Sequence, residues 1–277
     1  MTTAVEPREH TAEARGLRFH YVEWGESAAT PIVLLHGLSS MGRIWDTLAR
    51  ALHDRYRLIA LDQRGHGETS WPAEPAYATE DYVGDLEALI DGWELKRFAI
   101  IGLSMGGMNA IAYAARHPDR ITHLVPVDIP PAIRREGTPM YGLQKHVAEH
   151  GHPTFEDHDA ALQGVRLTNQ ITPDASLRHR LHYLLKRTKD GQWTFKHDPR
   201  VGYHWQPSDL WDELPKVQAP VLIVRGGKSQ VLSDERAERM RAAFANARLV
   251  TMQESGHTVP EDTPEAFIQV IQSFLAS

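Results

Sequence analysis

A serine flanked by glycines is the clearest sign of chemistry in this sequence. Ser104 stands in the motif Gly-x-Ser-x-Gly at residues 102–106. An apolar run at 98–101 precedes the motif, and helix-forming residues follow it at 108–116. A strand, turn and helix in this order lift a serine above the carboxyl edge of a parallel sheet. The glycines fit a turn so tight that a Cβ would clash. The pattern predicts a nucleophilic serine, and its alternative is a Gly-rich turn with an incidental serine.

Two other patterns could suggest a metal or a nucleotide. His146 and His150 are spaced i, i+4, but the glutamate between them is out of place for a zinc protease. A solvated helix face is the better interpretation of this pair. Residues 226–229 read Gly-Gly-Lys-Ser and lack the four-residue spacer of a phosphate-binding loop. We therefore expect no metal and no cofactor.

Composition narrows the class of protein further. The chain has 277 residues, 42% of them hydrophobic, which is enough for one large core. A net charge of −6 and the absence of a Lys/Arg run argue against nucleic acid as a partner. The sequence has no cysteine, so disulfides, thiolate metal sites and a cysteine nucleophile are excluded.

The sequence also bears on membranes and location. The first ten residues have no apolar run typical of a signal peptide. No later run approaches the roughly 18 apolar residues of a membrane span. We expect no membrane partner and a cytoplasmic location.

The elements that must position the serine alternate between strands and helices. Residues 17–24 alternate apolar and polar side chains, which is typical of a half-buried antiparallel strand. The run at 31–35 is apolar on both faces, as in a strand inside a parallel sheet, and the run at 57–61 is a second buried strand. Further strands are predicted at residues 98–101, 121–127, 220–225 and 247–252. Helices with one apolar stripe are predicted between several of them and after residue 263. This order predicts an α/β fold.

The alternation breaks after residue 131. Residues 132–205 contain helix-like stretches near 143–150, 155–167 and 177–187, with no buried-strand run between them. We interpret this segment as a helical lid inserted between sheet strands. The expected core is then formed by residues 1–131 and 206–277.

Four motifs in this order resemble the α/β-hydrolase fold superfamily over nearly the whole chain. They are His36-Gly37 after the third strand, Asp62-x-Arg-Gly-His-Gly67 after the fourth, Gly102-x-Ser-x-Gly106 after the fifth, and Gly256-His257 after the last. The resemblance implies an eight-stranded, mostly parallel sheet with helices on both faces. It implies an active site at the carboxyl edge of the sheet. It also implies a structural role for the loop at 62–67, with His66 as a hydrogen-bonding residue.

In such a site the serine needs a base and an oxyanion hole. His257 is the candidate base, because its loop follows the last strand of the sheet. Backbone N–H groups of Leu38 and Met105 are the candidate oxyanion donors. Their side chains matter less than their amides.

The acid of the triad departs from the commonest superfamily pattern. The usual aspartate after the seventh strand is replaced by Gln230, which cannot stabilise an imidazolium by charge. Asp234 and Glu235 lie at what reads as the start of a helix, where acids are ordinary. Asp128 directly follows the sixth strand, and some superfamily members carry the acid there. We predict Asp128 as the acid; the alternative is a turn aspartate.

These residues predict a cofactor-independent serine hydrolase acting on a small ester, lactone or activated amide through an acyl-enzyme. The resemblance also reaches C–C bond hydrolases, perhydrolases and enamide hydrolases. A ligand-binding receptor that retains the fold is the alternative from another class. Epoxide hydrolases and haloalkane dehalogenases are disfavoured, because they need a carboxylate where Ser104 stands.

The expected partner is a small molecule, and the protein itself is expected to be a monomer or small homo-oligomer. Arg43, beside the oxyanion loop, and Arg134 or Arg135, just past Asp128, could pair with a substrate carboxylate. Solvation at the surface is the alternative role for each of them.

Overall fold

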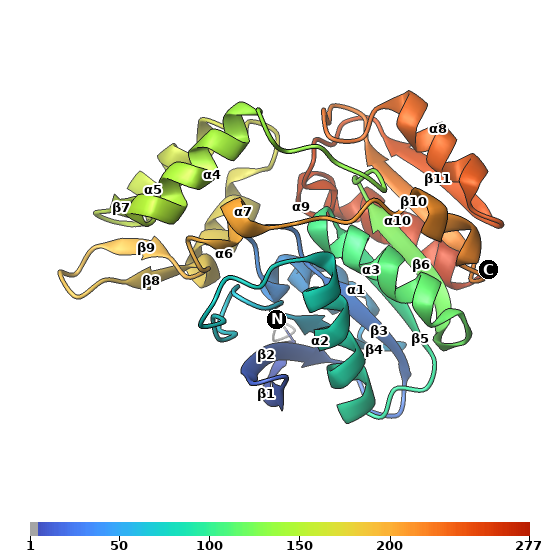
Figure 1. Ribbon diagram of the computed structural model, residues 1–277. Coiled ribbons are helices and arrows are strands. Elements are labelled where there is room, and N and C mark those ends of the chain that lie inside the picture. Colours follow the sequence, from blue (N-terminus) through green and yellow to red (C-terminus); the bar gives the residue numbers. More distant parts are fainter. Residues whose placement is uncertain (1–4) are drawn as a thin grey trace.

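An eight-stranded sheet forms the centre of the molecule (Figure 1). The computed structural model describes residues 5–277. The strand order is β1-β2-β4-β3-β5-β6-β10-β11, and only β2 runs antiparallel to the rest. The strands are β1 (Arg8–Ala14), β2 (Leu17–Trp24), β3 (Thr30–Leu35), β4 (Tyr56–Leu61), β5 (Phe98–Leu103), β6 (Ile121–Val127), β10 (Val221–Gly226) and β11 (Ala247–Met252). The predicted α/β-hydrolase sheet is confirmed.

The central strands are buried because both of their faces are apolar. All six residues of β5 and all six of β10 are buried. Neighbouring parallel strands end at the same edge, which brings the loops after β3, β5, β6, β10 and β11 together. β1 was not predicted, because its sequence is polar and its residues are exposed or half-buried at the edge of the sheet.

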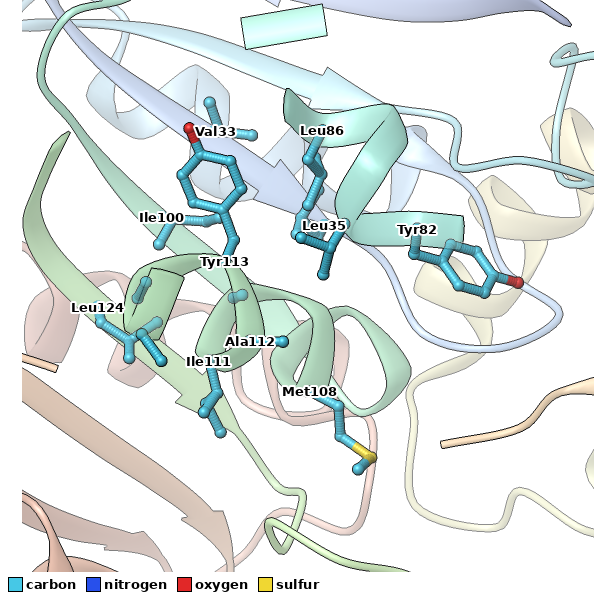
Figure 2. Close-up of a cluster of buried hydrophobic side chains, with 14 of the residues drawn as sticks. Val33, Leu35, Tyr82, Leu86, Ile100, Met108, Ile111, Ala112, Tyr113 and Leu124 are labelled. Carbon is cyan, nitrogen blue, oxygen red and sulfur yellow. The ribbon is translucent and has the colours of Figure 1, made fainter. Parts of the chain in front are cut away.

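Helices cover both faces of the sheet. One face carries α2 (Thr79–Gly92), α3 (Met105–Arg116) and α8 (Asp234–Ala243), together with the 3-10 helix η3 (Trp211–Lys216). Figure 2 shows part of this core, where Met108, Ile111 and Tyr113 of α3 lie among side chains of α2 and the sheet. The other face carries η1 (Gly42–Trp45), α1 (Asp46–Leu52), α9 (Val259–Asp262) and α10 (Pro264–Leu275). A short turn of helix, η2 (Pro118–Arg120), leads into β6.

Residues 132–205 form a separate layer beside the carboxyl ends of the strands (Figure 1). The segment holds α4 (Pro139–His150), β7 (Thr154–Phe155), α5 (His158–Arg166), α6 (Asp174–Leu184), β8 (Leu185–Arg187), β9 (Trp193–Phe195) and α7 (Val201–His204). Its own small core contains Leu162, Leu177 and Leu181.

The sequence-based interpretation of this segment was wrong in one respect. The helix expected over 177–187 ends at Leu184, and the next three residues form β8 of a three-stranded sheet, β7-β9-β8. Strands of two or three residues are too short to show a period-2 pattern. The aromatic and β-branched residues of β9 were the available signal.

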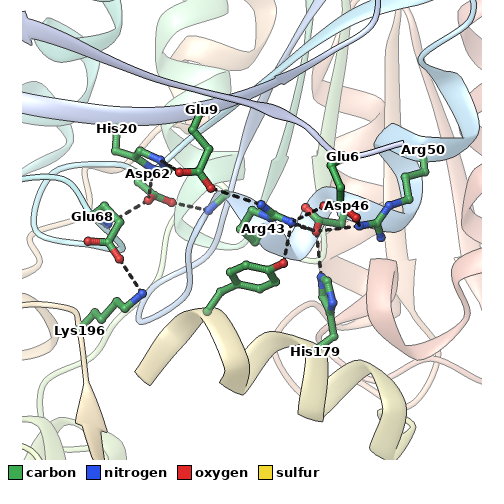
Figure 3. A network of polar contacts seen from close by, with 12 residues as sticks. Glu6, Glu9, His20, Arg43, Asp46, Arg50, Asp62, Glu68, His179 and Lys196 are labelled. Atoms are coloured by element: carbon green, nitrogen blue, oxygen red, sulfur yellow. Dashed lines mark hydrogen bonds and ion pairs between the residues drawn. The ribbon is translucent and has the colours of Figure 1, made fainter. Parts of the chain in front are cut away.

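Polar contacts join this layer to the rest of the molecule. The His179 ring of α6 lies 3.0 Å from the Asp46 carboxylate of α1, within the network of Figure 3. Arg180 donates to Glu261 of α9 at 2.7 Å. Helix α6 is therefore tied to the helices η1, α1 and α9 below it. Within the described residues, no helix has the length and apolar character needed to cross a membrane.

Candidate active site

Ser104 lies at the sharp turn between β5 and α3. Its φ of +53° and ψ of −121° are unfavourable for a residue with a side chain, with a typical cost of about 1–3 kcal/mol. A Cβ on Gly102 would fall on the carbonyl oxygen of Gly106, and one on Gly106 would fall on that of Leu35. Only glycine fits at either position. The turn holds the serine at the N-terminus of α3, at the carboxyl edge of the sheet.

His257 and Asp128 are joined by a hydrogen bond. His257 follows β11 and Asp128 follows β6, so they come from loops 129 residues apart in sequence. His257 Nδ1 lies 2.7 Å from Asp128 Oδ2. Asp128 is fully buried, whereas the imidazole is 38% exposed. A buried carboxylate on Nδ1 fixes the tautomer that leaves Nε2 as a proton acceptor.

Two further donors hold the carboxylate of Asp128. The backbone N–H of Gly226 donates to Oδ1 at 3.0 Å, and the Ser229 hydroxyl donates to Oδ2. With His257, three groups bond to this one buried carboxylate and fix its orientation. Sequence reasoning missed Ser229, which is adjacent to Gln230 in the loop where the acid usually lies.

The loop after β3 approaches the serine closely. A Cβ on Gly37 would lie 3.3 Å from the Cβ of Ser104, so glycine allows this approach. Neither the Leu38 nor the Met105 N–H group has a hydrogen-bond acceptor within residues 5–277. Two unpaired amides beside a serine can receive a developing oxyanion.

Two buried histidines hold this loop in place. The N–H of Ser39 donates to His66 Nε2 at 3.1 Å, and the N–H of Gln63 donates to His36 Nε2 at 3.0 Å. Burial lowers the pKa of His66 to about 3 and also lowers the pKa of His36. Both rings are therefore neutral and can accept these bonds. The structure places His66 as the hydrogen-bonding residue that the sequence predicts.

Ser104 and His257 line one cavity of about 880 Å³, together with Leu38 and Gln230. No hydrogen bond joins the serine hydroxyl to the imidazole in the described structure. Such bonds are often long until substrate is bound. Asp234 does not fit the role of the acid beside His257, because it is 80% exposed and pairs with Arg225 at 2.9 Å.

The comparisons with known proteins agree with this geometry. A family profile described as "alpha/beta hydrolase fold" matches residues 30–264. The chain belongs to this family. It is 30% identical to Esterase Rv0045c of Mycobacterium tuberculosis, over 92% of this chain and 85% of the relative. It is 28% identical to 2-(acetamidomethylene)succinate hydrolase of Mesorhizobium japonicum, over 90% of this chain and 90% of the relative.

A solved structure is similar as well. The enol-lactonase from Burkholderia xenovorans LB400 superposes with a TM-score of 0.79 at 25% identity, covering 97% of this chain and all of that one. Because the named relatives are esterases and other hydrolases, this α/β hydrolase is an enzyme.

The structure does not bring Arg43 into the cavity of this hydrolase. Its guanidinium is buried and donates to Asp46 at 2.9 Å and to the Tyr183 hydroxyl at 2.8 Å. Glu6 and Glu9 lie within 4 Å of the same group, as Figure 3 shows. These contacts turn the side chain away from Ser104, so the expected pairing of Arg43 with substrate needs correction.

Other arginines do line the cavity. Arg134 and Arg135 reach it as the sequence suggests, and Arg180 and Arg236 reach it without having been predicted. Arg236 lies in the first turn of α8, which follows β10 at the carboxyl edge of the sheet. That position was the available signal.

The structure also locates the patterns that suggested a metal. The rings of His146 and His150 stack 4.3 Å apart on α4, whose residues are all exposed or half-buried. Within residues 5–277, no group of three or more potential metal ligands is found. Lys228, in the Gly-Gly-Lys-Ser stretch, forms an ion pair with Glu254.

Proposed function

We propose that this enzyme is a cofactor-independent serine hydrolase that cleaves a small ester, lactone or activated amide through an acyl-enzyme. The observation that carries this proposal is the convergence of Ser104, the bonded pair His257–Asp128 and two unpaired amides on one cavity. Ser104 is the nucleophile, His257 the base and Asp128 the acid. The Leu38 and Met105 amides form the oxyanion hole.

The proposed reaction has two halves. Ser104 Oγ attacks the substrate carbonyl while His257 Nε2 takes the hydroxyl proton, and the oxyanion forms between the two amides. The imidazolium is stabilised by Asp128 and returns the proton to the leaving group. Water activated by the same imidazole then releases the acid and restores the serine.

We further propose that residues 132–205 act as a lid. They supply Arg134, Met140 and Gln144 to the wall of the cavity, and they lie beside the carboxyl edge of the sheet. A lid excludes water from the reaction and shapes the acyl pocket. This segment should therefore determine substrate choice more than the chemical step.

Among these substrates, an activated amide, whose C–N bond would be cleaved by the same residues, has support of its own. It is supported by the similarity to 2-(acetamidomethylene)succinate hydrolase. The serine, histidine and acid would perform the same acyl transfer with an amine in place of an alcohol as leaving group.

Turnover of short p-nitrophenyl esters and simple lactones tests the proposal. The wild-type enzyme should release product steadily, and activity should persist in EDTA. Ser104→Ala should lower kcat by about 10⁴ or more, leaving only binding and oxyanion effects. Mass spectrometry with a slow ester should find the acyl group on the peptide that contains Ser104. Full activity of Ser104→Ala would overturn the scheme, and one-time labelling without turnover would favour a receptor.

A further inference from the structure

The cavity beside Ser104 is lined by one sign of charge. Four arginines contribute to its wall, and no aspartate or glutamate does. The whole chain has 36 acidic and 30 basic residues, so this local excess runs against the composition. A cavity lined by one sign of charge attracts ligands of the other sign.

Three of these arginines have no acidic partner in the described structure. Arg236 donates to the carbonyl oxygen of Ala132 at 2.7 Å, and Arg134 is exposed at the cavity mouth. Arg135 donates to two backbone carbonyl oxygens, and to the Gln144 side chain at 2.6 Å. None of the three forms an ion pair with a carboxylate within residues 5–277.

Arg180 and Glu136 do not alter the excess of positive charge at this cavity. Arg180 pairs with Glu261 at 2.7 Å, so it has a carboxyl partner within the protein. Glu136 lines a neighbouring hollow with Arg135 but not the cavity of Ser104. Elsewhere in the protein, buried arginines have acids, as Arg64 does with Asp85. Three of the four arginines at this cavity therefore keep a charge with no acid beside it in the described residues.

A second cavity, mostly apolar, adjoins the first. It shares Leu38 and Ser40 with the first and continues beneath α4 and α5, where Leu143, Val147 and Val165 line it. The site thus has a cationic part, formed by Arg134, Arg135 and Arg236, and a mostly apolar part beneath α4 and α5. A substrate that fills both parts of the site has one anionic and one apolar portion.

From this arrangement we propose that the substrate carries an anionic group, a carboxylate or a phosphate, in addition to the carbonyl that Ser104 attacks. This proposal rests on the hydrolase function above. Arg134 and Arg236 bind the anion, and Arg135 adds charge from the wall. The guanidinium fork matches either anion with paired N–H donors.

A matched pair of esters tests the proposal. The mono-p-nitrophenyl ester of adipic acid carries a free carboxylate, and its methyl ester is neutral. Wild-type kcat/KM should favour the anionic ester by about tenfold or more, because a hydrogen bond to a charged group contributes about 1.5–3 kcal/mol. Arg134→Gln and Arg236→Gln should each reduce that ratio several-fold, and the double variant should abolish it. Arg134→Lys and Arg236→Lys should retain part of it.

A control variant and two outcomes separate the anion proposal from the hydrolase function. Arg97→Gln removes an exposed arginine outside the cavity and should leave the ratio unchanged. Turnover of both esters at equal kcat/KM, or an unchanged ratio in the double variant, would overturn the anion proposal and leave the hydrolase function standing. Failure to turn over either ester, with no acyl group on Ser104, would instead overturn the hydrolase function.

Inhibition of neutral-ester hydrolysis identifies the anion. Free adipate and inorganic phosphate are compared at equal ionic strength, because salt screens these contacts. Stronger inhibition by adipate supports a carboxylate, and stronger inhibition by phosphate supports a phosphate. The absence of inhibition by both at tens of millimolar would contradict the proposal.

Discussion

At the scale of single residues, the proposed acid lies in the loop after β6, but the loop after β10 still supports it. The carboxylate of Asp128 comes from the loop after β6, yet it is held by Gly226 and Ser229 of the loop after β10. Adjacent parallel strands lie about 4.8 Å apart, so either loop can reach the histidine. The loop after β10 thus supplies hydrogen-bond donors to an acid that comes from the loop after β6.

Replacing the carboxylate tests this arrangement. Asp128→Asn should lower kcat by about 10²–10⁴ with the fold intact, because the amide favours the wrong tautomer and cannot stabilise the imidazolium. Asp234→Asn is the control and should lose less than twofold in kcat, since Asp234 is 80% exposed and its partner is Arg225. Steady-state kinetics on one ester compares the two. A near-normal Asp128→Asn beside an inactive Asp234→Asn would show that the acid lies in the other loop.

Residue types and order were enough to predict where the reacting groups lie, but not what supports them. Ser104, Asp128 and His257 each lie in the loop or turn that follows a predicted strand, so sheet topology places them at one edge. Ser229 could not be found this way, because its partner is set by loop conformation. Arg43 shows the same limit: it is next to the oxyanion loop in sequence, but Asp46 and Tyr183 hold its side chain elsewhere.

At the scale of elements, the oxyanion loop depends on a second loop. Ser39 has a φ of +60°, an unfavourable conformation for a serine, and its N–H is held by His66 from the loop after β4. His66 is completely buried and donates its other ring N–H to the Arg64 carbonyl oxygen. The position of the Leu38 amide therefore depends on a neutral imidazole in the next loop.

Two substitutions of His66 separate this role from simple packing. His66→Leu removes the acceptor for the Ser39 N–H and should lower kcat by about tenfold to a hundredfold, because a displaced oxyanion donor stabilises the transition state less. His66→Gln offers a carbonyl oxygen at a similar distance and should recover much of that loss. Stopped assays at saturating ester measure both. Equal kcat in the two variants would contradict the proposed function of the hydrogen bond.

Element prediction succeeded where burial dictates the pattern and failed where it does not. The strands β3, β5 and β10 are buried on both faces, so their sequences are unbroken apolar runs. Edge strand β1 and the short strands β7, β8 and β9 are stabilised by backbone pairing more than by burial of apolar side chains. Pairing of this kind leaves little trace in local hydrophobicity.

At the scale of the whole molecule, residues 132–205 are joined to the core by buried polar groups. Arg180 of α6 pairs with Glu261, and Thr172 donates to Asp262, both on α9. Helix α9 follows the His257 loop, so the same contacts connect the proposed lid to the loop of the base. These partners are 81 to 90 residues apart in the chain, which is why the sequence did not reveal them.

Glu261 makes this connection sensitive to pH. Burial raises the pKa of its carboxyl group to about 7, in spite of the opposing effect of Arg180. In the unfolded chain the pKa is near 4.5. Between these two values the folded protein keeps a proton that the unfolded chain has lost. The free energy of unfolding should therefore fall as pH rises from about 4.5 to about 7, by roughly 3 kcal/mol from this group, and change no further above that.

Glu261→Gln should remove this contribution, because glutamine does not titrate. The free energies of unfolding of wild type and Glu261→Gln are measured by urea denaturation at pH 5, 6, 7 and 8. The wild type should lose stability relative to the variant between pH 5 and 7, and the difference should then stay constant. Glu265→Gln, which alters an exposed glutamate on α10, controls for the general loss of a carboxylate. If the wild type instead gains stability relative to Glu261→Gln as pH rises, the ion pair with Arg180 outweighs the effect of burial. In that case α9 and α6 would be held most strongly at neutral pH, the reverse of the order expected here.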